Sequence, residues 1–354
     1  MWTDDNGEIM DVDKLNSVQK AAYLLIKQDL RYIYTVMQKI NPNESNYIPS
    51  MLPYLGVVID GAEDWLKAVR NSSKCKLFVP LFNEAETIFY EEIRNSIKMW
   101  QKDYNKIYTL LEKAYRISDN YFGSVCKPIA KMLKLYDVYG MNDINGVICG
   151  NTILCYYYTP FFSYSENNGM YIKLMSIISG QYIKLFDAMA DLRVNSTFQF
   201  HDRDYGGFIK SPVGNVYNDK FALLSILCQI NFLLYGVDKW IINEVPTKLR
   251  FGYLLYFSLI NIIGQINEKL SIDLSINQKW KSDKFRNAMA HYKLGIVLKE
   301  SELVIDDLMF GLTEKLFGED YYTVKTSIYK ELEGLAKQIG EYLKLPKWMV
   351  YLQQ

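Results

Sequence analysis

Apolar residues recur at three- and four-residue spacing through most of the chain, a pattern that indicates α-helices. One continuous apolar stripe predicts a long helix over residues 84–117. The same spacing predicts four more helices before position 200, over residues 13–40, 50–70, 123–137 and 169–193. The run 153–164 is rich in tyrosine and phenylalanine and fits either a buried helix or an aromatic loop.

The helical pattern disappears over residues 195–216, where glycine, proline, asparagine and aspartate cluster. We therefore predict a helical region over 1–208, with a role in sensing, regulation or dimer extension, and a separate bundle over 209–354. Further helices are expected in the second part, over residues 217–242, 247–270, 277–294 and 322–344. Four helices of this length favour a four-helix bundle, so the expected fold class is all-α.

Composition narrows the kinds of site that the chain can hold. Its 40 basic residues balance 40 acidic residues, so a polyanion would have to bind a local basic patch. The five cysteines form no C-x-x-C pair and only two histidines are present, which argues against a zinc site. We expect buried thiols, no metal and no cofactor. The acidic N-terminus lacks an apolar core, so no signal peptide is expected and a cytoplasmic location is predicted.

Two uncharged runs, 221–237 and 251–267, reach about the minimum length for crossing a membrane. Each run contains two polar residues: Gln229 and Asn231 in the first, Asn261 and Gln265 in the second. Because such residues are costly in lipid, a buried helical hairpin is favoured over a membrane hairpin. We expect no membrane contact.

Chemistry is concentrated in one short segment, residues 285–292, which holds one of the two histidines. On a helix, Asn287 and His291 share a face, and the long Arg286 side chain can reach toward the imidazole. Asp283 extends this polar face and offers, with Asn287, a hydrogen bond that would fix the histidine tautomer. Histidine suits proton transfer near neutral pH, and arginine suits recognition of phosphate oxygens. These are the groups needed to cleave RNA by attack of the 2′-hydroxyl without a metal.

Lysines surround this segment and form a local basic collar. Such a collar could bind the RNA backbone in an otherwise neutral protein, although surface lysines are common. The RNA-binding residues that we predict are Lys281, Lys284 and Lys293.

The sequence Arg286-Asn287-x-x-x-His291, on the penultimate long helix of a predicted bundle, resembles the R-N-x-x-x-H motif of the HEPN superfamily. The resemblance covers roughly residues 210–350. It implies a metal-independent ribonuclease of the kind found in toxin–antitoxin, abortive-infection and CRISPR-linked defence systems. Arg286 and His291 would be catalytic, and Asn287 would orient them. In one toxin subfamily an antitoxin nucleotidylates a tyrosine two positions after the histidine, but Lys293 stands there, so this regulation is not expected.

HEPN active sites are typically composite, with two motif copies facing each other across a dimer. The other histidine, His201, has no arginine four to six residues before it. The chain would then supply one half-site, and the resemblance implies a homodimer through the motif helix. An antitoxin or another regulatory protein is a further expected partner.

Two alternatives stay open beside this hypothesis. The chain could be a non-catalytic HEPN-like module that binds RNA, nucleotide or a partner protein, or a helical scaffold in which the motif is structural. The segment 201–207 is interpreted as a plain turn rather than a functional loop. The acidic residues near position 88 are interpreted as a solvated helix face rather than a metal site: Glu84, Glu86, Glu91 and Glu92.

Overall fold

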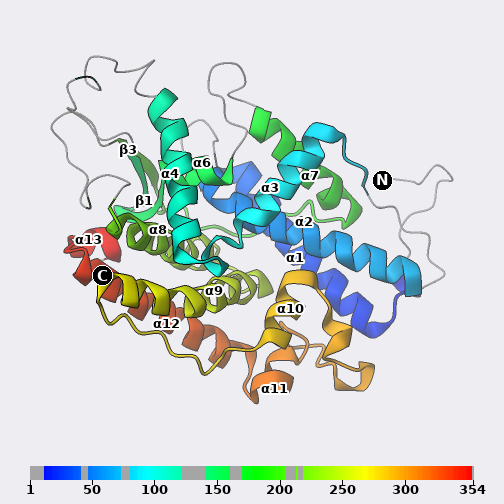
Figure 1. Ribbon diagram of the computed structural model, residues 1–354. Coiled ribbons are helices and arrows are strands. Elements are labelled where there is room, and N and C mark those ends of the chain that lie inside the picture. Colours follow the sequence, from blue (N-terminus) through cyan, green and yellow to red (C-terminus); the bar gives the residue numbers. More distant parts are fainter. Residues whose placement is uncertain are drawn as a thin grey trace.

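The computed structural model describes residues 12–40, 47–72, 80–121, 132, 140–159, 170–204, 213 and 218–352. These residues form a predominantly helical protein with one small sheet, which confirms the expected all-α class (Figure 1). The main helices are α1 (Ser17–Lys39), α2 (Tyr47–Ser72), α3 (Glu84–Ser96), α4 (Tyr104–Tyr121), α6 (Thr152–Tyr158), α7 (Met170–Leu185), α8 (Lys220–Asn231), α9 (Pro246–Leu270), α10 (Asp283–His291), α11 (Leu312–Phe317), α12 (Tyr321–Tyr342) and α13 (Lys347–Val350). A π-helical segment, η4 (Phe232–Lys239), continues α8, and short 3-10 turns are η1 (Val12–Lys14), η2 (Met99–Gln101), η5 (Leu294–Ile296) and η6 (Glu300–Glu302).

Several helices lie where the apolar spacing predicts them, with bounds set by local capping. Helix α1 begins after a capping box, in which the Asn16 side chain accepts a hydrogen bond from the Gln19 backbone and the Gln19 side chain accepts one from the Asn16 backbone. Pro246 occupies the first turn of α9, where its missing N–H costs no hydrogen bond. Helices α2 and α12 also match, and α8 with η4 fills the predicted range 217–242.

The predicted continuous helix over residues 84–117 is wrong. The chain forms α3, turns through η2, and begins again as α4. Helix α3 packs mainly against α2, whereas α4 packs mainly against α6, so the two halves of one apolar stripe have different main partners. Trp100 is buried at the turn and donates a hydrogen bond from Nε1 to Gln229 Oε1 at 2.5 Å.

Two other predicted helices are shorter than expected. Helix α7 ends at Leu185 rather than near residue 193, and Asp187 adopts a left-handed φ of 48° in the turn that follows. Helix α10 covers residues 283–291 rather than 277–294, because tyrosines of α9 bond carbonyl groups of the non-helical segment before it and Tyr292 ends it in a left-handed conformation. Tyr253 donates to the Trp280 carbonyl oxygen at 2.9 Å, for example. The predicted helix 123–137 lies outside the described residues, apart from Met132.

A three-stranded antiparallel sheet, which the helical pattern did not predict, lies at one end of the molecule (Figure 1). Its strands are β1 (Gly140–Ile144), β2 (Val147–Asn151) and β3 (Phe200–Asp204), in the order β2-β1-β3. Asn145 and Gly146 join β1 to β2 with φ values of 51° and 90°, as a tight hairpin turn requires. His201, predicted to lie in a turn, is instead paired with Asp143 in the sheet. The ambiguous aromatic run begins as helix α6.

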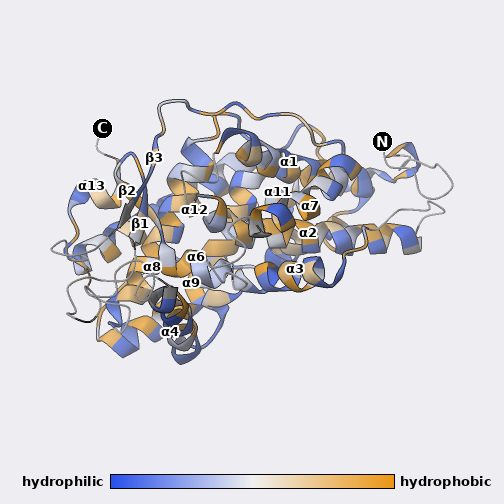
Figure 2. Ribbon diagram, turned by 90° about the horizontal axis from the view of Figure 1, so that it is seen from above, coloured by the Kyte–Doolittle hydropathy of each residue, from blue (hydrophilic) through white to orange (hydrophobic). Residues whose placement is uncertain are grey.

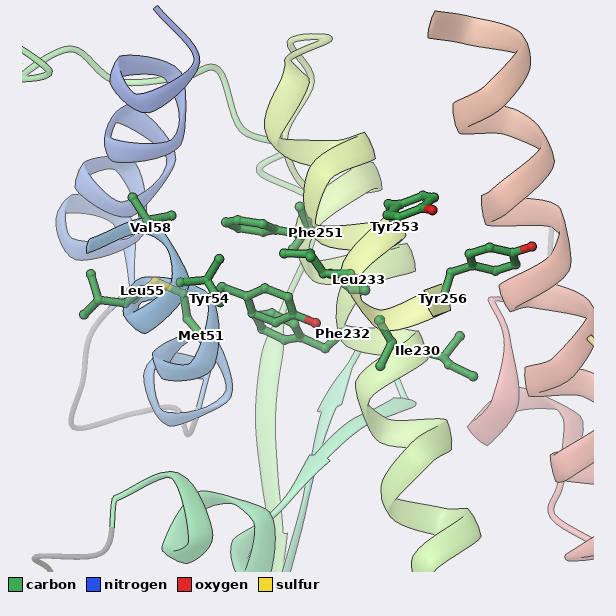
Figure 3. Close-up of a cluster of buried hydrophobic side chains, with 14 of the residues drawn as sticks. Met51, Tyr54, Leu55, Val58, Ile230, Phe232, Leu233, Phe251, Tyr253 and Tyr256 are labelled. Atoms are coloured by element: carbon green, nitrogen blue, oxygen red, sulfur yellow. The ribbon is translucent and has the colours of Figure 1, made fainter. Parts of the chain in front are cut away.

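The first and second parts of the chain share a hydrophobic core. Helices α1 and α2 contact α9 and α10, and their buried residues belong to the same cluster. Figure 3 shows Tyr54 of α2 close to Phe232 and Phe251, with the Tyr54 and Phe251 ring centroids 4.6 Å apart. Apolar residues concentrate on the inward sides of these helices (Figure 2). The boundary at 208/209 stays a prediction, and the shared core means that α2 lies within reach of the motif helix.

Two helical segments are long and apolar enough to cross a membrane, judged by length and composition alone: Lys220–Lys239 and Pro246–Leu270. Inside the protein, 89% and 83% of their most apolar windows are buried, as is usual for core helices. Two of their polar side chains illustrate how such groups are bonded within the protein. Asn231 donates to the Ile148 carbonyl oxygen at 2.9 Å, and Gln265 accepts from the Tyr104 backbone at 3.0 Å.

Candidate functional site

Helix α10 carries the Arg-Asn-x-x-x-His segment, and its apolar spacing determines how the helix is docked. Ser282 caps its first turn by accepting a hydrogen bond from the Phe285 backbone N–H at 3.2 Å. The buried residues follow i, i+3, i+4, i+7 spacing: Phe285, Ala288, Met289 and Tyr292. Arg286, Asn287 and His291 therefore lie on the flanks of the helix rather than on its buried face.

A buried charged cluster fixes the C-terminal end of α10. Tyr292 ends the helix with a left-handed φ of 50° and donates from its hydroxyl to Asp29 Oδ2 of α1 at 2.6 Å. Burial raises the pKa of Tyr292, so the hydroxyl keeps its proton. Arg250 of α9 pairs with the same Asp29 oxygen, donates to the Met289 carbonyl, and lies 4.0 Å from the centroid of the Tyr292 ring. Three helices are thus joined directly beside His291.

Helix α2 approaches α10 very closely at Gly61. A Cβ atom at this position would lie 2.7 Å from the Ala290 carbonyl oxygen and 2.7 Å from the Tyr292 ring. Both distances are shorter than van der Waals contact, so only glycine permits this spacing of the two helices. The close approach brings the carboxylates of Asp60 and Asp64 beside His291.

His291 is partly enclosed between these elements, with 29% of its side chain exposed. Its Nδ1 atom lies 3.0 Å from Asp64 Oδ2 and 3.9 Å from Asp60 Oδ2. The Asp64 contact is electrostatic, because the N–H direction is not aligned for a hydrogen bond. Burial lowers the pKa of His291 and outweighs the two carboxylates, which act to raise it. The ring is therefore neutral at pH 7 and able to accept a proton.

Arg286 is held in place without charge compensation. Its Nη1 donates to Asn287 Oδ1 at 2.8 Å, and the guanidinium lies 5.6 Å from the Phe257 ring centroid. Within the described part of the chain, Arg286 Nε has no hydrogen-bond partner and no carboxylate lies within 4.0 Å of the guanidinium. Arg286 is near enough to His291 to lower the pKa of the imidazole. A half-buried cation of this kind can bind an anion such as a phosphate.

Asn287 and Lys293 have different partners from those expected. The described hydrogen bond of Asn287 is to Arg286, and the group beside His291 is Asp64 rather than Asn287. Lys293 Nζ lies 3.3 Å from Asp64 Oδ2, so its charge is partly neutralised. Lys281 donates to Asn261 Oδ1 at 3.3 Å, and Lys284 is exposed on α10. The basic collar for RNA stays a prediction, carried mainly by Lys281 and Lys284.

Sequence reasoning missed four charged residues that surround the motif: Asp29, Asp60, Asp64 and Arg250. Arg250 offered a signal, because it is a charge between Leu249 and the apolar run that begins at Phe251. Asp60 and Asp64 are four residues apart and so share a helix face. No local pattern connects either of them to His291.

Metal-ligating side chains do not gather in the described part of the chain, where no group of three or more His, Cys, Asp or Glu could hold a metal ion. Cys149, Cys155 and Cys228 are buried thiols, and burial raises the pKa of each. Cys75 and Cys126 lie outside the described residues. Glu86 completes a capping box with Asn83 at the start of α3.

Comparison with known proteins gives no match, whether with protein-family models, curated protein sequences or solved structures. The HEPN resemblance therefore rests on the Arg286-Asn287-x-x-x-His291 motif and the helix that carries it.

Proposed function

We propose that this protein is a metal-independent endoribonuclease whose active site is built around Arg286 and His291. The observation that carries the proposal is the state of Arg286. Its guanidinium is oriented by Asn287 and has no carboxylate within 4.0 Å among the described residues, while the neutral His291 lies nearby. An uncompensated cation next to a neutral imidazole suits the binding and cleavage of a phosphodiester.

In the proposed reaction, the 2′-oxygen of a ribose attacks the adjacent phosphorus. His291 accepts the 2′-hydroxyl proton, the P–O5′ bond breaks, and a protonated imidazole donates a proton to the leaving 5′-oxygen. Arg286 stabilises the charge that develops on the phosphoryl oxygens. The products are a 2′,3′-cyclic phosphate and a 5′-hydroxyl. Each step is a proton or phosphoryl transfer, so the reaction needs no redox partner.

One protomer contributes one imidazole near Arg286, whereas the reaction uses a base and an acid. The proposed active form is therefore a homodimer in which two copies of α10 face each other and share the two roles. Asn287 and Lys284 are exposed on α10 and are three residues apart, so they share a helix face that a partner or an RNA strand could contact. A toxin or antiviral defence effector is the biological role that we propose for such an enzyme.

The test is cleavage of defined single-stranded RNA in EDTA by the full chain, with the product ends identified by mass spectrometry. We expect cyclic phosphate ends from the wild-type protein and a loss of roughly 100-fold or more in His291→Ala and Arg286→Ala. Matched controls are His201→Ala, whose imidazole is 53% exposed on β3, and Arg116→Ala, whose side chain is 68% exposed on α4. Both controls should cleave at the wild-type rate.

Light scattering on the same preparations should find a dimer. Equal cleavage in all variants, or no cleavage by the dimeric wild-type protein, would refute the ribonuclease. Filter binding on the same RNA measures binding separately. Binding without cleavage would instead support the non-catalytic HEPN-like binding module.

A further inference from the structure

His291 lies beside a carboxylate from the first part of the chain, Asp64 of α2. Asp64 Oδ2 lies 3.0 Å from His291 Nδ1, and Asp64 is held on α2, which the Gly61 contact presses against α10. Its side chain is 35% exposed, so the carboxylate is accessible yet close to the ring. The carboxylate contacts of His291 within the described residues involve Nδ1, and we infer that Nε2 faces the substrate.

Asp60 and Glu63, the neighbouring acidic residues of α2, are already engaged by other groups. Asp60 pairs with Arg94 at 3.2 Å and accepts a hydrogen bond from the Tyr90 hydroxyl at 3.1 Å. Glu63 accepts from the same hydroxyl and pairs with Lys67. Asp60 Oδ2 lies 3.9 Å from His291 Nδ1, so Asp64, at 3.0 Å, is the nearer carboxylate of α2.

Lys293 partly neutralises Asp64, whose negative charge would otherwise repel a phosphate. Its Nζ lies 3.3 Å from the same Asp64 oxygen that faces His291. The cation offsets the negative charge of Asp64 toward an approaching RNA strand, while the carboxylate still contacts the ring. The groups that face His291 are thus Asp60 and Asp64 from α2, with Arg286 and Lys293 from α10 and the residues after it.

We propose that Asp64 is a positioning residue that fixes the orientation and tautomer of His291, so that a residue of the first part of the chain completes the proposed active site. A carboxylate at Nδ1 favours the tautomer with the proton on Nδ1 and a free lone pair on Nε2. The proton acceptor for the 2′-hydroxyl is then Nε2. This inference rests on the proposed ribonuclease function for its role in catalysis, but the contact with the ring can be tested by itself.

The presence of two histidines makes the test direct. In the full chain labelled with ¹⁵N-histidine, the ring nitrogens of His201 and His291 give two sets of signals, assigned with His201→Ala. We expect Asp64→Asn to change the tautomer of His291 and to lower its pKa, because a neighbouring negative charge is lost. The signals of His201 should not change. Glu63→Gln, one residue earlier on α2, is the matched control and should leave His291 unchanged.

RNA cleavage by the same variants gives the second readout. Asp64→Asn should reduce kcat by roughly ten- to a hundredfold with little change in KM, and should move the acidic limb of the pH profile to lower pH. Asp64→Glu keeps the carboxylate and should recover part of the rate. If Asp64→Asn, Asp64→Glu and Glu63→Gln all have the thermal midpoint of the wild-type protein, unfolding is excluded as the cause of a lower rate.

Unchanged His291 signals in Asp64→Asn would overturn the inference, whatever the cleavage activity. Changed signals in a wild-type protein that cleaves no RNA would refute the ribonuclease but uphold Asp64 as the residue that positions the imidazole. Changed signals with an unaltered kcat would overturn the catalytic part of the inference.

Discussion

The buried Asp29–Arg250–Tyr292 cluster should be the most sensitive structural feature of this protein. Asp29 and Arg250 are each 1% exposed, and they join α1 to α9 and α10. In Arg250→Met, a buried carboxylate would keep only the Tyr292 hydroxyl as a partner. Removing one member of a buried ion pair costs about 3–5 kcal/mol in the free energy of unfolding. A folded domain has about 5–15 kcal/mol in total, so this variant should be severely destabilised.

Replacing both charges separates the cost of an unpaired charge from the value of the pair. Asp29→Leu combined with Arg250→Met leaves no buried charge, and buried pairs can often be replaced by apolar residues with little loss. The Tyr292 hydroxyl would lose its acceptor in this background, at about 1–3 kcal/mol. Adding Tyr292→Phe removes the unpaired hydroxyl and should restore this part of the free energy of unfolding. The double variant should therefore be more stable than Arg250→Met alone.

The assay is denaturant unfolding of the full chain, followed by tryptophan fluorescence and by circular dichroism at 20 °C. Lys337→Met is the control, because Lys337 pairs with Glu333 at 2.8 Å on the surface and both side chains are nearly half exposed. Losing that pair should cost less than about 0.5 kcal/mol. Equal midpoints for Arg250→Met and Lys337→Met would refute the reasoning, as would a double variant no more stable than Arg250→Met.

Three further predictions concern single positions. Gly61→Ala would place a Cβ 2.7 Å from the Ala290 carbonyl oxygen. We therefore expect the free energy of unfolding to fall by about 1–3 kcal/mol and the ¹⁵N signals of His291 to change. Unchanged signals would show that the spacing of α2 and α10 does not hold the ring. The proposed reaction uses one neutral and one protonated imidazole, and burial lowers the pKa of His291, so cleavage should follow a bell-shaped pH profile with its maximum below about pH 6.5; a maximum above pH 7 in an RNA-cleavage assay would contradict the lowered pKa. Gly146→Ala would force a side chain into a φ of 90° in the β1–β2 turn, at a cost of about 1 kcal/mol in the free energy of unfolding, measured by denaturant unfolding. Gly180→Ala, in open space on α7, is a control that should not be destabilised.

Most helices can be obtained from the sequence because their signals are local. Apolar spacing and capping residues such as Asn16 and Pro246 depend on neighbours within one or two turns. The break near Trp100 could not be predicted in this way, because α3 and α4 share one apolar stripe, and their main partners, α2 for α3 and α6 for α4, are set by tertiary packing. The β1–β2 hairpin has a local signal in Asn145-Gly146, a pair that favours a tight turn, but the apolar spacing of most of the chain is helical and does not indicate a sheet.

In the candidate site, too, some features follow from local sequence and others from tertiary packing. Arg286, Asn287 and His291 are found from the sequence because their chemistry and spacing lie within one short helix. Their partners come from packing: Tyr292 bonds Asp29, which is 263 positions away in the chain, and His291 faces Asp64 because Gly61 lets α2 approach α10. A helix face is determined by successive residues, whereas the partner of a charge is determined by which helices the whole core brings together. The sequence alone thus identifies the candidate groups. The tertiary structure decides that Arg286 has no carboxylate within 4.0 Å among the described residues and that the imidazole is partly buried beside Asp64.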